Sequence, residues 1–316
     1  MENTKPTFSE LFEQTINFPD PDMLDRFNLL VGLDNTKETL KKILGLLINP
    51  DGVAQWASKH HPDADLILNF VTRRPPLIVL AGDVGSGKSE LAYTIGDAVA
   101  RQQGIDVELF PLSLATRGQG RVGQMTQLIS SAFDYTLERA KKLKNTSGKS
   151  RGAVILLVDE ADALAQSRES DQMHHEDKAG VNAFIRGIDG LGNGKYPAAV
   201  IMCTNRPNSL DPAIRRRAAE IVYFKRPTEE GRHLVLDAPL RELGFNAEDI
   251  QTIVDLTGPR SDRPYGFTFS DLVQRLLPSL ILDAYPNNAV NPERAIVITE
   301  SLLPTSPFKE NVEHGK

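Results

Sequence analysis

Five runs of consecutive hydrophobic residues, separated by stretches with helical spacing, dominate the first two thirds of the chain. Unbroken apolar runs of this length are typical of strands that are buried on both faces of a parallel sheet. Their alternation with helical stretches predicts an α/β fold with a largely parallel, five-stranded sheet covered by helices. The predicted strands are residues 76–82, 106–112, 153–159, 198–204 and 220–224.

The residues before the first of these strands divide into an arm and a helix. Residues 1–25 contain three prolines and little sustained periodicity, so we expect an N-terminal arm or a short helix there. Helical spacing begins at Phe27 and should end at Pro50. The expected buried face of that helix consists of Leu40, Ile43, Leu44, Leu47 and Ile48.

The pattern changes after Pro227, where helical spacing replaces most of the apolar runs. Helices are predicted for residues 228–243, 246–257 and 269–285, and one late strand for residues 295–299. We therefore expect a small, mostly helical second domain. The expected boundaries are residues 1–25 for the arm, 26–227 for the large α/β domain, 228–303 for the helical domain and 304–316 for a polar tail.

The composition is typical of a globular protein in the cytoplasm. Of the 316 residues, 40% are hydrophobic and 25% are charged, and no apolar run approaches the roughly 20 residues of a membrane helix. The polar N-terminus lacks the apolar stretch of a secretory signal, and the single cysteine, Cys203, fits a reducing compartment. We expect a cytoplasmic protein that does not bind a membrane.

The charge balance argues against a broad nucleic-acid-binding surface. The chain has 36 Lys and Arg residues against 42 Asp and Glu residues, which gives a net charge of −6. Basic residues do cluster locally, at residues 141–145 and 215–217. An acidic chain is a poor match for the phosphate backbone, so we do not expect a nucleic-acid partner.

A glycine-rich octet, GDVGSGKS, follows the first predicted strand and leads into a helical stretch. Its glycines allow backbone N–H groups to approach phosphate oxygens closely, and the N-terminus of the helix adds partial positive charge. Lys88 should reach the β- and γ-phosphates, and the Ser89 hydroxyl should ligate Mg²⁺. The expected nucleotide-binding residues are Gly82, Asp83, Val84, Gly85, Ser86, Gly87, Lys88, Ser89 and Glu90.

Polar side chains end the third and fourth predicted strands, at the edge where open α/β sheets bind ligands. We expect Asp159 to hold Mg²⁺ and Glu160 to orient and polarise the water that attacks the γ-phosphate. Thr204 and Asn205 follow the fourth strand, and the amide of Asn205 can hydrogen-bond both that water and the γ-phosphate. Together with the octet, these residues predict hydrolysis of ATP.

These motifs resemble those of the AAA+ family of P-loop ATPases, and within it the AAA group. Their order matches the family over most of the chain, from about residue 31 to residue 272. Residues 31–40 resemble the opening segment, which implies that Val31, Gly32 and Leu33 border the adenine of ATP. The extended carboxylate motif, the sensor with the second region of homology, and the lid motif correspond to residues 159–168, 204–217 and 266–272.

Members of this family form hexameric rings in which a neighbouring subunit supplies an arginine finger. The resemblance therefore implies a homohexamer and places the finger at Arg217. Arg216 and Arg215 are the alternatives, because this segment is two residues shorter than the usual pattern. Guanidinium suits the role because it stays charged and spreads its donors over the phosphate. The position of the second finger falls on Glu220, a departure from the family.

Motors of this group grip a polypeptide with a loop after the second strand. At that place the chain has Arg121, Val122 and Gly123, without the usual aromatic residue. We expect these residues to contact a protein substrate threaded through the pore, and an ordinary glycine-rich loop is the alternative. A second pore loop is expected within residues 167–180, whose adjacent histidines diverge by about 100° on a helix and do not predict a metal site.

Residues 181–190 and 215–218 resemble the pachytene-checkpoint type of AAA+ ATPase. Such enzymes remodel HORMA-domain proteins, and bacterial relatives occur in anti-phage operons beside a cyclic-oligonucleotide synthase. The lid position of the arginine sensor in eukaryotic members falls on Ser270. The resemblance predicts an ATP-driven protein-remodelling motor, while a nucleic-acid-associated ATPase and a metabolic-enzyme chaperone of the Rubisco-activase kind stay open as alternatives.

Overall fold

The fold is given by a computed structural model that groups the chain into two compact units. It describes residues 6–12, 14–113, 124–145, 150–165, 175–192, 194–208 and 210–307. The first unit consists of Met1–Leu29, Asn35–Ala81 and Ser89–Tyr223. The second consists of Leu30–Asp34, Gly82–Lys88 and Phe224–Lys316.

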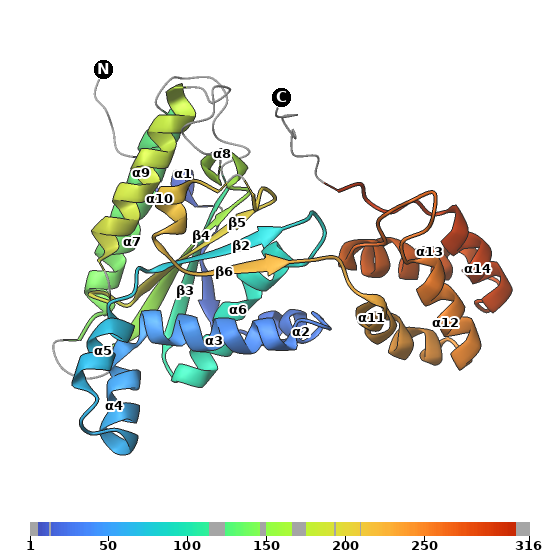
Figure 1. Cartoon of the computed structure of the whole chain (residues 1–316), viewed down its shortest axis with the longest axis horizontal. Coiled ribbons are helices and arrows are strands. Elements are labelled where there is room, and N and C mark those ends of the chain that lie inside the picture. Colours follow the sequence, from blue (N-terminus) through green and yellow to red (C-terminus); the bar gives the residue numbers. More distant parts are fainter. Residues whose placement is uncertain are drawn as a thin grey trace. The chain divides into compact units, whose positions relative to one another are not determined.

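A six-stranded sheet forms the centre of the α/β part of the chain (Figure 1). Its order is β1-β3-β4-β5-β2-β6, and β3, β4, β5 and β2 pair in parallel. All five predicted strands are confirmed: β2 (Leu77–Gly82), β3 (Asp106–Ser113), β4 (Gly152–Asp159), β5 (Ala198–Thr204) and β6 (Ala218–Phe224). Every residue of β5 is buried, as the unbroken apolar run indicated.

The predicted strand number was wrong by one, because β1 (Ile16–Phe18) joins the sheet antiparallel to β3. This strand lies between α1 (Phe8–Leu11) and α2 (Pro21–Asn28), in the stretch expected to form an arm. Phe18 is buried against Gly96, where a Cβ atom would collide with the Phe18 ring. Three residues are too few to show the alternation that predicts a strand, so a long-range contact decides this element.

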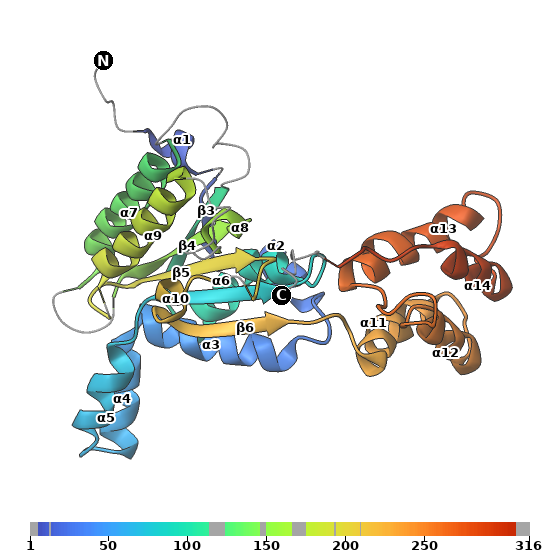
Figure 2. The same ribbon diagram turned by 45° about the horizontal axis from the view of Figure 1, so that its top comes forward.

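Helices cover both faces of the sheet (Figure 1, Figure 2). On one face, α7 (Gln124–Leu143) and α9 (His175–Leu191) lie side by side, and α3 (Asp34–Ile48) and α6 (Lys88–Gln103) lie on the other. Two single-turn helices, α8 (Asp162–Ala165) and α10 (Pro212–Arg215), follow β4 and β5. No helix within the described part of the chain is long and apolar enough to cross a membrane.

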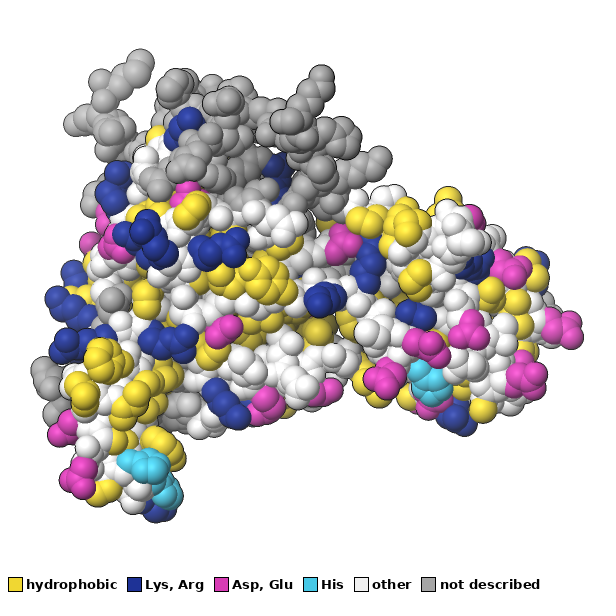
Figure 3. All heavy atoms as spheres, viewed as in Figure 1, with side chains coloured by type: hydrophobic (Ala, Val, Ile, Leu, Met, Phe, Trp, Pro, Cys, Tyr) yellow, Lys and Arg dark blue, Asp and Glu magenta, His cyan; other side chains and the backbone are white. Residues whose placement is uncertain are grey.

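Pro50 begins a new helix instead of ending helical structure. After α3, the chain forms the hairpin of α4 (Pro50–His60) and α5 (Asp65–Thr72), because proline is well tolerated in the first turn of a helix. This hairpin exposes large apolar side chains, which gather at the lower left of Figure 3. They are Trp56, Leu66, Ile67 and Phe70.

The second unit has a helical core of its own. The helices predicted after Pro227 are confirmed as α11 (Glu229–Glu242), α12 (Ala247–Leu256), the π-helical turn η1 (Asp271–Leu276) and α13 (Leu277–Ala284). The π-helical turn precedes Pro278, which cannot donate a backbone hydrogen bond. The core side chains include Leu236, Leu240, Ile250, Ile253 and Leu276.

The strand predicted for residues 295–299 was wrong, because these residues belong to α14 (Pro292–Ser301). The side chain of Asn291 accepts a hydrogen bond from the backbone N–H of Arg294 (3.0 Å) and caps the helix, and Pro292 occupies its first turn. Ala295 and Thr299, four residues apart, form its buried face. The cap and the packing of that face outweigh the β propensity of the apolar run.

Candidate functional site

The glycine-rich octet forms a loop between β2 and α6, and most of it lies in the second unit. The Nζ atom of Lys88 donates hydrogen bonds to the carbonyl oxygens of Gly82 (3.0 Å) and Asp83 (2.6 Å). The hydroxyl of Ser86 donates to the carbonyl of Asp83 at 2.7 Å. Lys88 and Ser86 are both buried, so the loop is held from inside by its own side chains.

Two glycines of the loop cannot be replaced without moving its neighbours. Gly82 and Gly85 have φ angles of +153° and +70°. A Cβ atom on Gly82 would collide with the carbonyl oxygen of Phe224, and one on Gly85 would lie 2.7 Å from the hydroxyl of Thr268. The backbone N–H of Ser270 donates to the carbonyl of Gly85 at 3.0 Å. The loop is therefore packed against the predicted lid motif.

Residues 30–34 also belong to the second unit and lie beside the loop. A Cβ atom on Gly87 would be in contact with Leu33, at 3.4 Å. Gly32 has a φ angle of +81° and lies beside the ring of Phe269. Val31 is 37% exposed, so its side chain is accessible for contact with a ligand. The structure thus brings the predicted adenine segment together with the phosphate loop and the lid motif.

The second residue of the loop, Asp83, forms a nearly buried ion pair with Arg226, with the two side chains 16% and 13% exposed. The Arg226 guanidinium donates to Oδ2 of Asp83 (2.7 Å) and to the carbonyl oxygens of Gly266 (2.6 Å) and Thr305 (2.8 Å). Its centre lies 5.0 Å from the centroid of the Tyr265 ring. No motif of the sequence indicated Arg226, which stands 143 residues from its partner.

Ser89 and Asp159 meet in the first unit. The Ser89 hydroxyl donates to Oδ1 of Asp159 at 3.0 Å, and the backbone N–H of Glu160 donates to the same oxygen at 2.9 Å. Glu160 has a φ angle of +52°, the one non-glycine residue with positive φ among those the structure describes. A strained backbone conformation of this kind is often found at functional sites, and here it falls on the predicted water-orienting residue.

A third carboxylate, Asp162, fixes the predicted sensor. Its Oδ1 atom accepts from the hydroxyl of Thr204 (2.8 Å) and from the backbone N–H of Asn205 (2.7 Å). Its Oδ2 atom accepts from Nδ2 of Asn205 at 3.1 Å. Because the carboxylate takes an amide proton, the side-chain oxygen of Asn205 has a defined direction. Asp162 lies within the extended carboxylate motif at residues 159–168, but no role was predicted for it from the sequence.

Glu90, the last predicted nucleotide-binding residue, forms an ion pair with Arg26 of α2. The guanidinium donates to both carboxylate oxygens of Glu90, at 2.7 and 2.9 Å. The hydrogen bonds to Glu90 raise the pKa of Arg26 above its ordinary value. Glu90 thus ties the start of α6 to the N-terminal segment of the chain.

The predicted arginine finger, Arg217, lies directly before β6. It donates to both carboxylate oxygens of Asp189 in α9, at 2.7 and 3.0 Å, and to the carbonyl of Ala213 at 3.2 Å. The hydrogen bonds to Asp189 raise the pKa of Arg217. Arg216 is exposed at the end of α10. Both side chains lie at the surface of the first unit.

Some predicted residues lie outside the described part of the chain. The proposed pore residues Arg121, Val122 and Gly123 fall there, and so do residues 167–174 of the second pore loop, which was expected within residues 167–180. Their roles stay predictions from the sequence.

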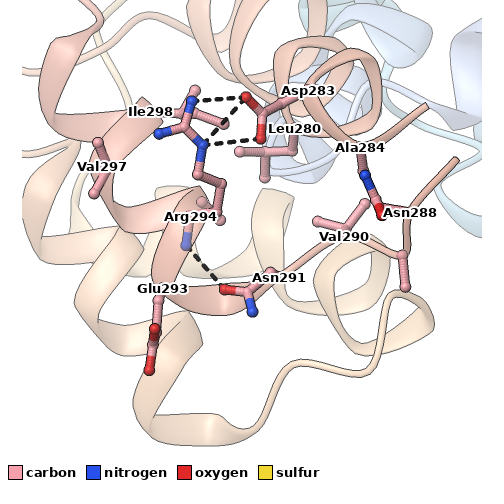
Figure 4. Close-up of a pocket in the computed structure, with 12 residues that line it drawn as sticks. Leu280, Asp283, Ala284, Asn288, Val290, Asn291, Glu293, Arg294, Val297 and Ile298 are labelled. Atoms are coloured by element: carbon pink, nitrogen blue, oxygen red, sulfur yellow. Dashed lines mark hydrogen bonds and ion pairs between the residues drawn. The ribbon is translucent and has the colours of Figure 1, made fainter. Parts of the chain in front are cut away.

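A surface pocket of about 760 Å³ lies between α13 and α14 (Figure 4). Arg294 crosses it and donates from Nη2 to Oδ1 of Asp283 at 2.9 Å. The two side chains are 57% and 28% exposed. No predicted site residue lines this pocket, and its ion pair is more exposed than the Asp83–Arg226 pair at the phosphate loop.

The chain is similar to known proteins along nearly its whole length. A model of the ATPase family associated with various cellular activities (AAA) matches residues 78–226. CD-NTase-associated protein 6 of Escherichia coli (strain MS 115-1) is 63% identical over 306 residues, covering 97% of this chain and 98% of that protein.

Solved structures agree with these matches. A chain of the E. coli MS115-1 HORMA:CdnC:Trip13 complex has a TM-score of 0.88 and 61% identity, with 96% of this chain and 100% of that chain covered. Rhizobiales Trip13 has a TM-score of 0.73 and 53% identity, with 94% and 100% covered. The fold, the phosphate loop and these similarities lead to one conclusion: the chain belongs to the AAA family of nucleotide-binding ATPases.

Proposed function

We propose that this ATPase is a protein-remodelling motor that acts on a HORMA-domain protein and thereby regulates bacterial anti-phage signalling. The observation that carries the proposal is the 61% identity and TM-score of 0.88 to a chain of a HORMA:CdnC:Trip13 complex, over 96% of this chain. The 63% identity to a CD-NTase-associated protein supports the same signalling context. No specific feature of the described residues favours a nucleic-acid substrate, and the net charge of −6 opposes one.

The phosphate loop and the segment before α3 are proposed to bind ATP. The loop amides and the N-terminus of α6 bind phosphate oxygens, and Lys88 pairs with the β- and γ-phosphates. The hydrogen bonds from its ammonium group to the carbonyls of Gly82 and Asp83 support this role, because they hold the charge at the loop. Val31, Gly32 and Leu33 border the adenine.

Ser89 and Asp159 are proposed to hold Mg²⁺. Their oxygen atoms are 3.0 Å apart, and hydroxyl, carboxylate and water oxygens are the ligands that Mg²⁺ prefers. The donor set of the chain therefore fits this metal. When bound, the ion neutralises charge on the phosphate oxygens.

Glu160 and Asn205 are proposed to prepare the attacking water. Glu160 follows Asp159 directly, and its backbone N–H donates a hydrogen bond to the Asp159 carboxylate. This bond fixes the position of the Glu160 backbone, from which its own carboxylate extends. Asp162 fixes the direction of the Asn205 amide. A water held between a carboxylate and an amide oxygen is oriented for attack on the γ-phosphate.

The active assembly is proposed to be a homohexamer in which Arg217 of one subunit completes the site of the next. A guanidinium at the surface of the first unit can exchange Asp189 for phosphate oxygens, since both are bound through paired N–H donors. Arg216 and Arg215 stand beside it as the alternatives. Arg121, Val122 and Gly123 are proposed to contact the protein substrate in the central pore.

The rate of ATP turnover in the presence of different partners tests this function. A HORMA-domain protein encoded beside the ATPase should stimulate turnover, whereas double-stranded DNA should not. Stimulation by DNA alone would refute the remodelling function.

The Glu160→Gln variant tests the role of Glu160, because it removes one negative charge without changing the size of the side chain. This variant should bind ATP, fail to hydrolyse it and retain the HORMA-domain protein in a stable complex on size-exclusion chromatography. Rapid hydrolysis by Glu160→Gln would exclude the role proposed for Glu160.

A further inference from the structure

The phosphate loop contains a carboxylate. Asp83 follows Gly82 directly, and its Oδ1 atom accepts a hydrogen bond from the backbone N–H of Val84 at 2.9 Å. The side chain is mostly buried, at 16% exposure. A bound triphosphate also carries several negative charges, and like charges repel each other more strongly in a mostly buried place than in water. An unpaired carboxylate at this position would oppose the binding of phosphate.

Arg226 compensates for that charge. Guanidinium is charged at every physiological pH, and Nε of Arg226 lies 2.7 Å from Oδ2 of Asp83. The other two nitrogens are occupied by the carbonyl oxygens of Gly266 and Thr305. Its planar group therefore has a fixed orientation. One edge binds the phosphate loop, and the other binds the C-terminal segment, the residues that follow α14 and include Thr305.

The C-terminal segment is itself fastened to the lid motif. Thr305 donates from its backbone N–H and from its hydroxyl to the two carboxylate oxygens of Asp271, at 3.0 and 2.7 Å. The same carboxylate accepts from the backbone N–H of Thr268 at 2.9 Å, and Thr268 packs against Gly85. Arg275 bonds both Asp271 and the carbonyl of Leu303. Hydrogen bonds thus connect Arg226 through Thr305 and Asp271 to Thr268, which packs against the phosphate loop, and they fix the position of Arg226.

We propose that Arg226 is a positioning residue for nucleotide binding, which neutralises Asp83 and fixes the first half of the phosphate loop. The Thr305 carbonyl and Asp271 hold Arg226 in place from the other side. Loss of Arg226 should then weaken nucleotide binding more for a nucleotide that carries more phosphate charges. The proposal rests on phosphate binding by the loop, and adds a determinant that belongs to neither the octet nor the carboxylate motif.

A purely structural ion pair is the alternative. Such a pair would stabilise the second unit without regard to the charge of the ligand. Its loss would weaken the binding of ATP, ADP and AMP by the same factor, because all three need the same folded loop. The dependence of the loss on the number of phosphates therefore separates the two roles.

The experiment measures the affinities of ATP, ADP and AMP for the full chain by titration calorimetry, in a Glu160→Gln background that prevents hydrolysis. Arg226→Ala should weaken ATP binding at least about tenfold, ADP binding less, and AMP binding least. Asp83→Asn in the Arg226→Ala background should restore most of the ATP affinity, because it removes the uncompensated charge. An equal loss for the three nucleotides, or no recovery in the double variant, overturns the proposal.

Two further variants keep the test decisive. Asp83→Asn alone leaves the charge of Arg226 uncompensated, so the ratio of ATP affinity to AMP affinity should rise severalfold, and an unchanged ratio counts against the proposal even if Arg226→Ala does not fold. Arg294→Ala breaks the exposed Arg294–Asp283 pair of the same unit and should leave all three affinities unchanged. If the unmodified chain binds no nucleotide, the proposed ATPase function fails instead.

Discussion

Arg217 and Arg226 stand on either side of β6 in the sequence, and each pairs with an aspartate, but the two pairs differ in burial. Arg226 is 13% exposed, and each of its three guanidinium nitrogens has a partner within the second unit. Arg217 is 30% exposed, and its main partner, Asp189, is 54% exposed. Arg226 is thus bound on all sides within its own unit, whereas Arg217, the proposed finger, is held mainly by an exposed carboxylate.

The energetics of ion pairs explain why this difference matters. An exposed pair such as Arg217–Asp189 contributes only about 0–1 kcal/mol, because water and salt compete for both charges. Breaking a nearly buried pair leaves a charge without a partner in a poorly solvated place, at a cost of about 3–5 kcal/mol. Separating Arg217 from Asp189 therefore costs little free energy, whereas separating Arg226 from Asp83 costs several kcal/mol.

The largest expected effect separates turnover from binding. Arg217→Ala should lower ATP turnover about 1,000-fold, because an arginine finger stabilises the transition-state charge, and should leave the affinity for ATP unchanged. Steady-state ATPase assays and nucleotide titrations on the same preparation measure both. If the affinity falls and turnover per bound ATP does not, the comparison between the two arginines breaks down.

Arg216→Ala is the matched control for that measurement, since its side chain is exposed one residue earlier. It should leave turnover within about threefold of the unmodified value. A thousandfold loss in Arg216→Ala together with activity in Arg217→Ala would move the finger to Arg216.

The next effect concerns stability. Arg226→Ala should lower the free energy of unfolding by about 3 kcal/mol, because Asp83 and the carbonyls of Gly266 and Thr305 lose their partner. Arg217→Ala should lower it by less than about 1 kcal/mol. Denaturant unfolding followed by circular dichroism compares the two variants directly. Equal losses would show that burial does not distinguish these pairs.

A smaller effect depends on pH and concerns Asp271, whose carboxylate holds Thr305, a partner of Arg226. Burial raises the pKa of Asp271, but hydrogen bonds from Thr268, Thr305 and Arg275 outweigh it, so this pKa lies below its ordinary value. A carboxylate with a lowered pKa stabilises the fold above the unfolded value of about 4, and the stabilisation is lost as the pH falls through the folded pKa.

Asp271→Asn should therefore lower the free energy of unfolding by about 1–2 kcal/mol at neutral pH. It should also flatten the decline of the melting temperature below about pH 4. Asp283→Asn, at the exposed pair of Figure 4, is the control and should change neither quantity appreciably. An unchanged acid transition in Asp271→Asn would show that Asp271 does not carry this dependence.

The smallest effect comes from the partner of Arg217. Asp189→Ala removes the carboxylate and should lower the free energy of unfolding by less than about 1 kcal/mol. Turnover should stay within about threefold if Arg217 acts as the proposed finger, because in that role it would bind phosphate and not Asp189. A large loss of turnover would mean that Asp189 orients Arg217 for its role, and Asp283→Asn again provides the reference.

The sequence predicted best where local pattern and structure coincide. The apolar runs identified five strands, and the reason is clearest for β2, β4 and β5, because strands buried on both faces need apolar residues throughout. The octet was recognisable because phosphate binding needs a specific spacing of glycines, Lys88 and Ser89. These features depend on neighbours in the chain, and the structure confirms the placement of the strands around the loop.

Long-range contacts explain what the sequence could not predict. β1 exists because Phe18 fits beside Gly96, and the Asp83–Arg226 pair joins residues 143 positions apart. Neither contact leaves a periodic signal. The helix at residues 295–299 shows the opposite error, since a local apolar pattern favoured a strand and the cap at Asn291 decided otherwise. Asp162 was visible in its motif, but its role became clear only beside Asn205.

The exposed hairpin of α4 and α5 carries an intrinsic fluorophore, Trp56. Trp56 is the single tryptophan of the chain, it is 54% exposed, and the rings of His60 and His61 lie 5.9 and 5.1 Å from it, centroid to centroid. All indole emission therefore comes from this hairpin. Whatever covers this hairpin should shift the emission to shorter wavelength, so its occupancy can be followed in solution without a label.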